Sequence, residues 1–212
     1  MEKPLMSAKQ PTEIRQAALV EAALRLAAQR SPADITTGDL AQAVGITQGA
    51  VFRHFSSKEA VWLAVLDWTA DTLMRRLQAA ADAELAKPDK LAPLAALQAV
   101  FMAHVDFVVA HPGVPRVIFQ ELQHAQDTAL KARVRGLMQQ YRALLMGVLE
   151  HAQEQRLLAP GTDLQAAAAL FVGSVQGLVM QSLISGEVHA MTRQAPGVFN
   201  IYLRGLTLKE AP

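Results

Sequence analysis

Apolar residues recur three or four positions apart along almost the whole chain, and this spacing constrains the fold more than any other feature. Residues at positions i, i+3, i+4 and i+7 share one face of an α-helix, so each such run predicts an amphipathic helix. No segment alternates apolar and polar residues as a half-buried strand does, and no internal repeat or low-complexity linker appears. The sequence therefore predicts an all-α fold. The first run consists of Leu19, Ala22, Ala23, Leu26 and Ala27.

Prolines, glycines and capping residues divide this pattern into separate helices. Pro32 is expected to end the first helix at or before Ser31, since proline cannot continue a helix. The capping residues expected from the sequence are Thr36 or Thr37, Thr47, Ser56 with Glu59 in a capping box, and Thr162 with Gln165 in a second box. The later helices are expected over residues 36–44, 47–55, 57 to before 88, 94–110, 115–124, 130–152, 164–186 and 194–208, the last with Pro196 in its first turn.

Composition limits the class of protein. A chain of 212 residues, 51% of them hydrophobic, can bury a sizeable core. The absence of cysteine excludes a disulfide scaffold and a thiolate metal site, and it fits a reducing compartment, so we expect a cytoplasmic protein. Residues 1–7 lack the apolar region of a signal peptide. Because the net charge is only +1, any basic surface that binds nucleic acid must be local.

The stretch from Leu164 to Gly186 carries no charge and is long enough to span a bilayer. Three glutamines, three serines and many alanines weaken its hydrophobicity, and neither flanking lysine or arginine nor an interfacial aromatic belt accompanies it. A helix that is apolar nearly all round is otherwise a buried one. We therefore expect a core helix and no contact with a membrane.

Two short helices separated by Gly45 follow a longer amphipathic helix, which is the layout of a helix-turn-helix. The second short helix is the candidate recognition helix. Val51 and Phe55 lie four residues apart, so they share one face and can pack on the preceding helices. Gly49 and Ala50 are small enough to let the backbone approach a major groove of DNA.

The segment from Ile35 to Ala60, ITTGDLAQAVGITQGAVFRHFSSKEA, resembles the TetR family of bacterial transcriptional regulators. Its Thr pair, the run L-A-x-x-x-G-I-T-x-G, the aromatic residue with x-x-F, and the final S-K-E carry the resemblance, which is strong over about residues 12–66. Two departures stand out. Phe52 replaces the usual tyrosine, whose hydroxyl reaches a phosphate in such proteins, and the usual Phe and Gly near the end of the first helix are replaced around Ala27 and Ser31.

The resemblance implies an N-terminal three-helix helix-turn-helix DNA-binding domain over residues 10–57 and a larger helical ligand-binding and dimerisation domain over residues 58–212. It also implies a dimeric, ligand-responsive regulator. We interpret this as a repressor that a small hydrophobic effector releases from a pseudo-palindromic operator.

Ten residues of the helix-turn-helix are the predicted DNA contacts. Arg53 is expected to reach guanine or a phosphate, with Gln48 beside it. Lys58 stands near a helix N-terminus, where a cation is unfavourable unless something such as a phosphate offsets it. His54 is expected to be a neutral phosphate donor. Thr36 and Thr37 are most simply helix caps, and a phosphate hydrogen bond from Thr37 is an additional role. The full predicted set is Thr36, Thr37, Thr47, Gln48, Gly49, Ala50, Phe52, Arg53, His54 and Lys58.

A dimer doubles the short footprint of one recognition helix, so a homodimer on a double-stranded DNA operator is expected. Gly173 and Gly177 lie one turn apart and permit close helix approach, although packing inside one subunit would explain them equally well. The apolar residues near these glycines are expected to form an apolar surface that a single chain leaves uncovered. The predicted interface residues are Phe171, Gly173, Val175, Gly177, Leu178, Phe199, Tyr202 and Leu206.

The resemblance also implies an effector pocket among the middle helices. Apolar walls with a few polar groups are typical of such pockets, while an ordinary place in the core is the competing interpretation of each residue. The identity of the effector stays open, and the apolar bias favours a hydrophobic or aromatic compound. The predicted pocket residues are Phe101, His104, Phe107, Phe119, Gln120, Tyr141, Gln176 and Met180.

Two alternative functions also have some support in the sequence. An all-helical metal-dependent enzyme would use Glu121 and His124, whose E-x-x-H spacing puts both on one helix face. A di-metal bundle needs a second such motif, and the sequence has none, so no metal, cofactor or catalytic residue is expected. The other alternative is a transcriptional activator of the same fold, because the sequence does not reveal where the operator lies relative to the promoter.

Overall fold

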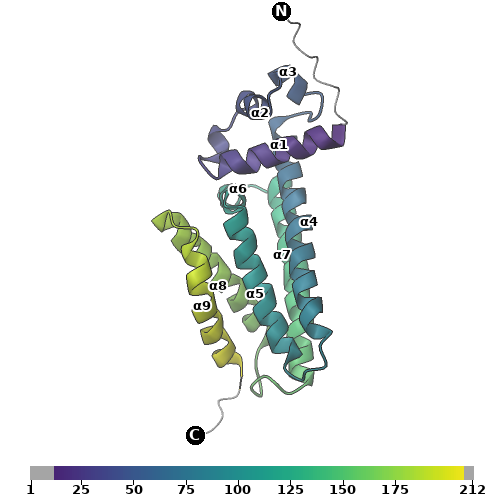
Figure 1. The fold of residues 1–212 in the computed structure, drawn as a ribbon, viewed down its shortest axis with the longest axis vertical. Coiled ribbons are helices and arrows are strands. Elements are labelled where there is room, and N and C mark those ends of the chain that lie inside the picture. The colour runs from purple at the N-terminus through teal and green to yellow at the C-terminus, as the bar shows by residue number, and fades with distance from the viewer. Residues whose placement is uncertain (1–11, 208–212) are drawn as a thin grey trace, which may run out of the picture.

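The computed structural model describes residues 12–207, which form helices and no strand, so the predicted all-α fold is confirmed (Figure 1). The expectations for residues 1–7, for the domain start at residue 10 and for a helix end at Leu208 lie outside the described residues. The elements are α1 (Thr12–Ala27), the short 3₁₀ turn η1 (Pro32–Asp34), α2 (Thr37–Ala43), α3 (Gln48–Val51), α4 (Lys58–Leu85), α5 (Ala92–Ala110), α6 (Gly113–Leu122), α7 (Ala129–Glu154), α8 (Leu164–Ser185) and α9 (Ala190–Leu206).

The helices form a small end piece and a longer bundle. Figure 1 shows α1, α2 and α3 gathered at one end, with α1 lying across the top of the bundle. Helix α4 leaves this end and runs along the bundle, where it packs on α5 and α7. Helices α8 and α9 pack on each other and on α5. One hydrophobic core continues from the end piece, through Val51 and Phe55, into the bundle, so the two parts share buried contacts.

Two predicted capping boxes are wrong by one residue. The cap of α4 is Ser57 rather than Ser56, and its hydroxyl accepts a hydrogen bond from the backbone N–H of Ala60 at 3.0 Å. The cap of α8 is Asp163 rather than Thr162, and its carboxylate accepts from the N–H groups of Gln165 and Ala166 at 2.9 and 3.1 Å. A carboxylate at a helix N-terminus also interacts favourably with the helix dipole, which favours Asp163 over a hydroxyl.

Two helix boundaries also differ from the prediction. Helix α3 ends at Val51 instead of near Phe55, because the next amides, of Arg53 and His54, bond back three residues in tight 3₁₀ fashion. Helix α9 begins at Ala190, four residues early, which places Pro196 inside the helix. Met191 is buried, so packing against the bundle fixes the first turn before the proline is reached.

Helices α5 and α8 are long and apolar enough to cross a membrane by length and composition alone. Half of the apolar window of α5 and 39% of that of α8 are buried inside the fold. Phe171 and Val175 of α8 are fully buried, and Phe171 meets Phe101 of α5 edge to face at 5.3 Å. Both helices therefore have the packing of core helices.

Candidate nucleic-acid interface and effector cavity

The N-terminus of α2 is closed by a reciprocal capping box. The hydroxyl of Thr36 accepts from the backbone N–H of Asp39 at 3.1 Å, and the Asp39 carboxylate accepts from the Thr36 N–H at 2.7 Å. Arg30 adds an ion pair to this carboxylate at 2.8 Å. Hydrogen bonds from the Arg30 side chain and then from Thr36 hold the pKa of Asp39 well below its usual range. Thr36 is thus fully engaged as a cap.

Helix α3 is held by its own cap and by a link to α2. Thr47 caps it, its hydroxyl accepting from the N–H of Ala50 at 3.3 Å. Val51 is buried on the inner face, as predicted. The side-chain amide of Gln48 donates to the hydroxyl of Thr37 at 2.8 Å, so two predicted DNA contacts are bonded to each other. This bond fixes the spacing between the first turns of α2 and α3 at the DNA-binding end of the molecule.

The outer face of α3 is open. Gln48, Gly49 and Arg53 are exposed, and the Phe52 ring is 49% exposed although it is apolar. A side-chain carbon placed on Gly49 would meet no atom within 4 Å, so packing inside the subunit does not require glycine there. Between Asp39 and Glu59 the chain has no carboxylate side chain, and it has three basic residues: Arg53, His54 and Lys58. This face is therefore open, locally basic and able to approach a polyanion.

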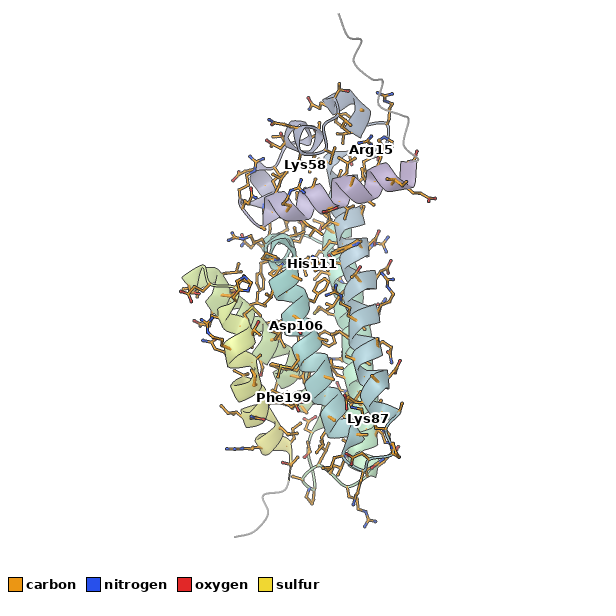
Figure 2. All side chains as sticks on the ribbon, in the orientation of Figure 1. Arg15, Lys58, Lys87, Asp106, His111 and Phe199 are labelled. Carbon is orange, nitrogen blue, oxygen red and sulfur yellow. The ribbon has the colours of Figure 1, made fainter. Side chains whose placement is uncertain are left out.

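Lys58 and His54 have partners that the sequence did not predict. The ammonium of Lys58, at the end formed by α1–α3 (Figure 2), donates to the carbonyl oxygen of Ala33 at 2.9 Å. A carbonyl oxygen of η1 thus stabilises this cation near the helix N-terminus, the role that the sequence predicted for a phosphate. The carbonyl oxygen of His54 accepts from the Gln16 side chain at 2.9 Å. His54 Nδ1 is buried without a partner among the described residues, so Nε2 is the ring atom left to reach a phosphate.

Helix α6 joins the DNA-binding end to the bundle. A side-chain carbon on Gly113 would lie 2.1 Å from the carbonyl oxygen of Leu24, so only glycine allows α6 to approach α1 this closely. Further along α6, the side-chain oxygen of Gln120 accepts from the N–H of Ala33 at 2.9 Å. Gln120, predicted to line the effector pocket, instead connects α6 to η1.

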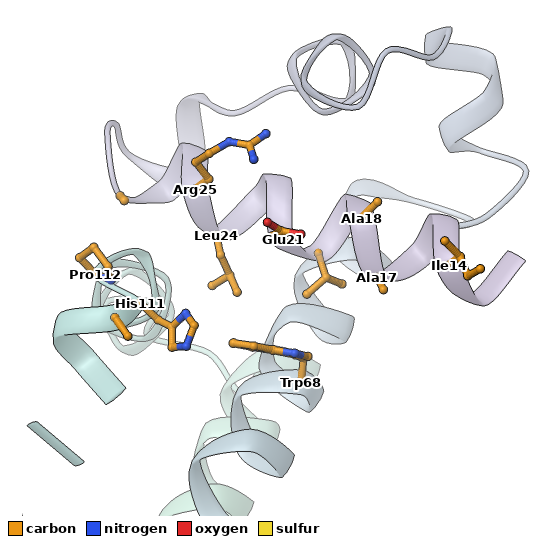
Figure 3. A pocket seen from close by; sticks show the side chains of 12 residues that line it. Ile14, Ala17, Ala18, Glu21, Leu24, Arg25, Trp68, His111 and Pro112 are labelled. Carbon is orange, nitrogen blue, oxygen red and sulfur yellow. The ribbon is translucent and has the colours of Figure 1, made fainter. Parts of the chain in front are cut away.

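Beside this contact lies an open groove of about 790 Å³ between α1, α4 and the α5–α6 turn (Figure 3). Figures 2 and 3 place His111 below α1, and its ring meets the Trp68 ring edge to face at 5.0 Å. Burial, together with the charge of Arg76, lowers the pKa of His111. The groove separates α1 from the bundle along part of its length, and on either side of it α1 packs on α4 and on α6.

An apolar cavity of about 120 Å³ lies inside the bundle. Four predicted pocket residues line it: His104, Phe107, Phe119 and Gln176. The other twelve lining residues come from α4, α5, α6, α7 and α8, and the sequence did not predict any of them as pocket residues. They are Leu73, Val108, Val114, Pro115, Ile118, Leu122, Val134, Leu137, Met138, Val172, Val175 and Val179. The four-residue spacing of Val114, Ile118 and Leu122 was a signal that α6 presents an apolar face.

Four predicted pocket residues lie elsewhere. Phe101 is fully buried in the core, where its ring meets those of Phe171 and Phe199 at 5.3 and 5.4 Å. Gln120 faces η1, and Met180 is 44% exposed on α8. Tyr141 stands behind the cavity wall rather than in it.

Tyr141 supports the main polar group of the cavity. Its hydroxyl and His104 Nδ1 form a hydrogen bond of 3.0 Å. Burial lowers the pKa of His104 to about 4 and raises that of Tyr141, so both are neutral at neutral pH. A neutral imidazole has one donor and one acceptor nitrogen, so Nε2 of His104 has the role that Nδ1 does not take with Tyr141. His104 can therefore offer one hydrogen bond to a ligand in the cavity.

The apolar residues predicted to form uncovered area are buried in the subunit, so that expectation is wrong. These six are Phe171, Val175, Leu178, Phe199, Tyr202 and Leu206. They belong to an aromatic and aliphatic core, in which the Tyr202 hydroxyl donates to the carbonyl oxygen of Ala167 at 3.2 Å. Gly173 and Gly177 do lie on the exposed side of α8, and an added side-chain carbon would meet no atom within 4 Å at either.

The E-x-x-H pair occupies a partly buried corner. Glu121 is buried and lies 3.9 Å from His124 Nε2, while the Thr128 hydroxyl donates to its other oxygen at 3.4 Å. Across residues 12–207, no third acidic residue or histidine joins them in a group that could hold a metal ion.

Comparison with known proteins matches both parts of the chain. Residues 19–65 match the tetR family of bacterial regulatory proteins, and residues 92–197 match a tetracyclin repressor-like C-terminal domain. The nucleoid occlusion factor SlmA of Escherichia coli is 24% identical over 165 residues, which cover 78% of this chain and 80% of that protein.

Solved structures share the fold. The transcriptional regulator FadR of Bacillus subtilis, solved in complex with stearoyl-CoA, is similar with a TM-score of 0.75 and 15% identity over 89% of this chain and 98% of that one. SmeT, the repressor of the Stenotrophomonas maltophilia multidrug efflux pump SmeDEF, has a TM-score of 0.72 and 17% identity over 94% and 93% of the two chains. With a helix-turn-helix at one end and both parts matched, the chain is a DNA-binding transcriptional regulator and not an enzyme, and it belongs to the tetR family.

Proposed function

We propose that the protein is a cytoplasmic, homodimeric repressor that a small hydrophobic effector releases from a pseudo-palindromic operator. The observation that carries this proposal is the outer face of α3. Gln48 and Gly49 of α3 and Arg53 of the turn that follows it are exposed there, while Val51 and Phe55 on the other side are buried in the core. A recognition helix needs this combination of a fixed inner face and an open polar outer face.

The predicted contacts divide into two kinds. Arg53 is the group on this face that can form paired hydrogen bonds to guanine, so it is proposed to read sequence. Thr37, Gln48 and Thr47 surround the helix starts, where backbone N–H groups favour phosphates. Lys58 already has a carbonyl partner, and a phosphate would add to that bond. Thr36, Ala50, Phe52 and His54 complete the proposed contact surface, as predicted from the sequence.

A stripe on α8 supports the dimer. Leu170, Gly173, Gly177, Met180 and Ile184 follow each other at three or four residues and are all exposed. Ile184 is 73% exposed. Ile201 on the neighbouring α9 is 75% exposed. An uncharged, apolar stripe with two glycines at its centre fits a second copy of the same helix at close range. We therefore propose that this stripe, which includes Gly173 and Gly177, is the dimer interface. The buried side chains predicted from the sequence are not part of it.

Helix α6 supports effector control. It contributes Val114, Ile118 and Phe119 to the cavity wall, and through Gln120 and Gly113 it contacts η1 and α1. A molecule that enters the cavity and displaces α6 would therefore shift the DNA-binding end. Coupling of this kind is worth ~1–3 kcal/mol between the two sites. FadR, which was solved with stearoyl-CoA, and SmeT, which is a repressor, have the same fold and support the proposal by similarity.

A gel-shift assay against DNA upstream of the protein's own coding region tests the proposal. We expect a specific shift that weakens with salt, because phosphate contacts release counterions. Arg53→Ala should lower affinity for the specific site by about tenfold or more, the value of a good base contact, and leave non-specific binding almost unchanged. Arg133→Ala is the matched control, since this exposed arginine of α7 pairs with Asp67 of α4, outside the helix-turn-helix. Equal behaviour of the two variants would contradict the assignment of α3.

A transcription assay with the same DNA separates repression from activation. Addition of the protein should lower transcript levels, whereas a rise would establish an activator of this fold.

The proposed division of the chain into residues 10–57 and 58–212 can be tested by limited proteolysis. The protease should cut between these two parts and not within α4.

A further inference from the structure

We infer that the effector is an amphipathic anion, whose apolar part occupies the cavity and whose negatively charged oxygen headgroup binds Arg135 and Arg142. The inference rests on the proposed function, because it names the chemical class of the molecule that the same cavity takes. It requires a basic groove at the mouth of the cavity, a passage between the two, and an interior that excludes charge.

The groove lies between α7 and α8. It has a volume of about 350 Å³ and is lined by Arg135, Met138, Gln139 and Arg142 of α7 and by Ala168, Ala169 and Val172 of α8. The four α7 residues are spaced i, i+3, i+4 and i+7, so they share one helix face. Two guanidinium groups, two turns apart, therefore stand on the same side of α7 above a floor of small apolar residues.

The groove and the cavity are neighbours. Met138 and Val172 line both of them, one from each helix, so they form the shared wall. Gln176, one turn beyond Val172, lines the cavity and is exposed. A flexible methionine at such a wall can change its rotamer and let a chain pass between the two spaces. One molecule can thus lie in both.

The volumes also favour a molecule that extends through both spaces. The cavity of about 120 Å³ is smaller than the roughly 300–1,000 Å³ of typical ligand pockets. The groove of about 350 Å³ reaches that range by itself, and joined to the cavity it extends into the apolar interior. A ligand confined to the interior would have to be very small.

The interior excludes charge, whereas the groove attracts anions. The polar residues that line the cavity are His104 and Gln176, and His104 is neutral at neutral pH. A charged group would therefore have no ionic partner inside and would be costly to bury. Between Ala129 and Leu149, α7 carries Lys131, Arg133, Arg135 and Arg142 with no carboxylate, and α8 has no charged residue. The headgroup thus belongs outside, at the arginines.

One carboxylate competes for this position. Asp127 accepts from Arg135 at 3.0 Å, and both side chains are more than half exposed. An exposed ion pair of this kind contributes little, so a bound anion can displace Asp127. Arg142 forms no ion pair with any of residues 12–207 and offers its guanidinium without competition.

Calorimetric titration with three ten-carbon compounds tests the inference: decanoate, decyl phosphate and decan-1-ol. They share one apolar chain and differ in the headgroup. We expect at least one anion to bind about tenfold or more tightly than the alcohol, and the comparison of the two anions identifies carboxylate or phosphate. Arg142→Gln and Arg135→Gln should each remove most of that advantage without changing the affinity for decan-1-ol. Arg133→Gln makes the same change in net charge on the same helix outside the groove, and it should retain wild-type binding.

The inference is wrong if neither anion binds more tightly than the alcohol, which includes the case in which none of them binds. It is also wrong if Arg133→Gln weakens anion binding as much as the two groove variants do. The gel-shift assay run with each compound separates it from the proposed function. Release of DNA by decan-1-ol as readily as by the anions would support effector control and contradict the anionic class. Arginine-dependent anion binding that leaves the DNA complex intact would support the site and contradict the proposed release.

Discussion

Single residues determine how the DNA-binding end is held on the bundle. Ala33 of η1 is bonded on both sides, since its N–H donates to Gln120 and its carbonyl accepts from Lys58, each at 2.9 Å. Gly113 allows α6 to lie against the backbone of Leu24. These contacts involve backbone atoms, so they fix the relative position of α1, η1 and α6.

Gly113→Ala should destabilise the protein. The added carbon would lie 2.1 Å from the carbonyl oxygen of Leu24, a backbone atom that cannot rotate away. Overpacking of this kind costs about 1–3 kcal/mol, to be measured as the free energy of unfolding in urea. Gly147→Ala on α7 is the control, because nothing lies within 4 Å of its added carbon, and it should be neutral or slightly stabilising. Equal stabilities of the two variants would contradict the close approach of α6 to α1.

His104 should make the fold sensitive to acid. Burial lowers its pKa from 6.5 to about 4, so the unfolded chain binds the proton more readily between these values. Stability is therefore retained above pH 6.5 and is lost as pH falls toward 4, by up to about 3 kcal/mol from this group. His104→Gln, which can still bond Tyr141, should lose less stability than wild type between pH 7 and pH 4.5 in urea titrations. Identical losses would mean that His104 is freely protonated in the folded state.

At the scale of the element, the starts of the helices depend on competition between neighbouring polar residues. Adjacent candidates occur at Ser56–Ser57 and Thr162–Asp163, and in each pair the second caps the helix. At α2 the candidates were Thr36 and Thr37, and Thr36 caps it. Thr37 is left free to bond Gln48. At α2, the choice of Thr36 as the cap leaves the Thr37 hydroxyl available on the surface that is proposed to contact DNA.

Thr36→Ala should shorten or loosen α2. It removes the hydroxyl that accepts from the N–H of Asp39, and loss of such a cap costs about 1 kcal/mol of unfolding free energy. Thr36→Ser retains the hydroxyl and should be close to wild type. Since α2 positions α3 through Gln48, the alanine variant should also bind operator DNA more weakly in the gel-shift assay. A loss of stability in the serine variant as large as in the alanine variant would show that the capping hydroxyl is unimportant.

At the scale of the whole molecule, the same two helices close the core and carry the surface proposed for a second copy. The inner faces of α8 and α9 hold Phe171, Phe199 and Tyr202 in one aromatic cluster, with ring centroids 5.4 to 6.5 Å apart. The outer stripe of α8 carries the two glycines and exposed aliphatic residues. A dimer built on this stripe would carry two copies of α3, as the proposed pseudo-palindromic operator requires.

Gly177→Trp should therefore convert the dimer to a monomer, as measured by light scattering after gel filtration. The indole would occupy the space that the second copy of α8 needs. Inside one subunit, a side-chain carbon added at Gly177 meets no atom within 4 Å. Gly147→Trp on the exposed side of α7 is the matched control and should stay dimeric. A dimeric Gly177→Trp protein with unchanged DNA affinity would place the interface elsewhere.

Much of the fold and part of the site were predictable from the sequence. Helical periodicity determined that the fold is all-α, and Gly45, Thr47 and the surrounding pattern identified the helix-turn-helix, because these are local properties of a few residues. Four of the eight residues predicted to bind the effector line the cavity: His104, Phe107, Phe119 and Gln176. The burial of Phe171 and Phe199, the turn of Gln120 toward η1, and the meeting of α7 and α8 at Arg142 were decided only by the tertiary structure. Periodicity shows which residues share a helix face but not which neighbour that face meets, since this depends on contacts between residues far apart in the chain.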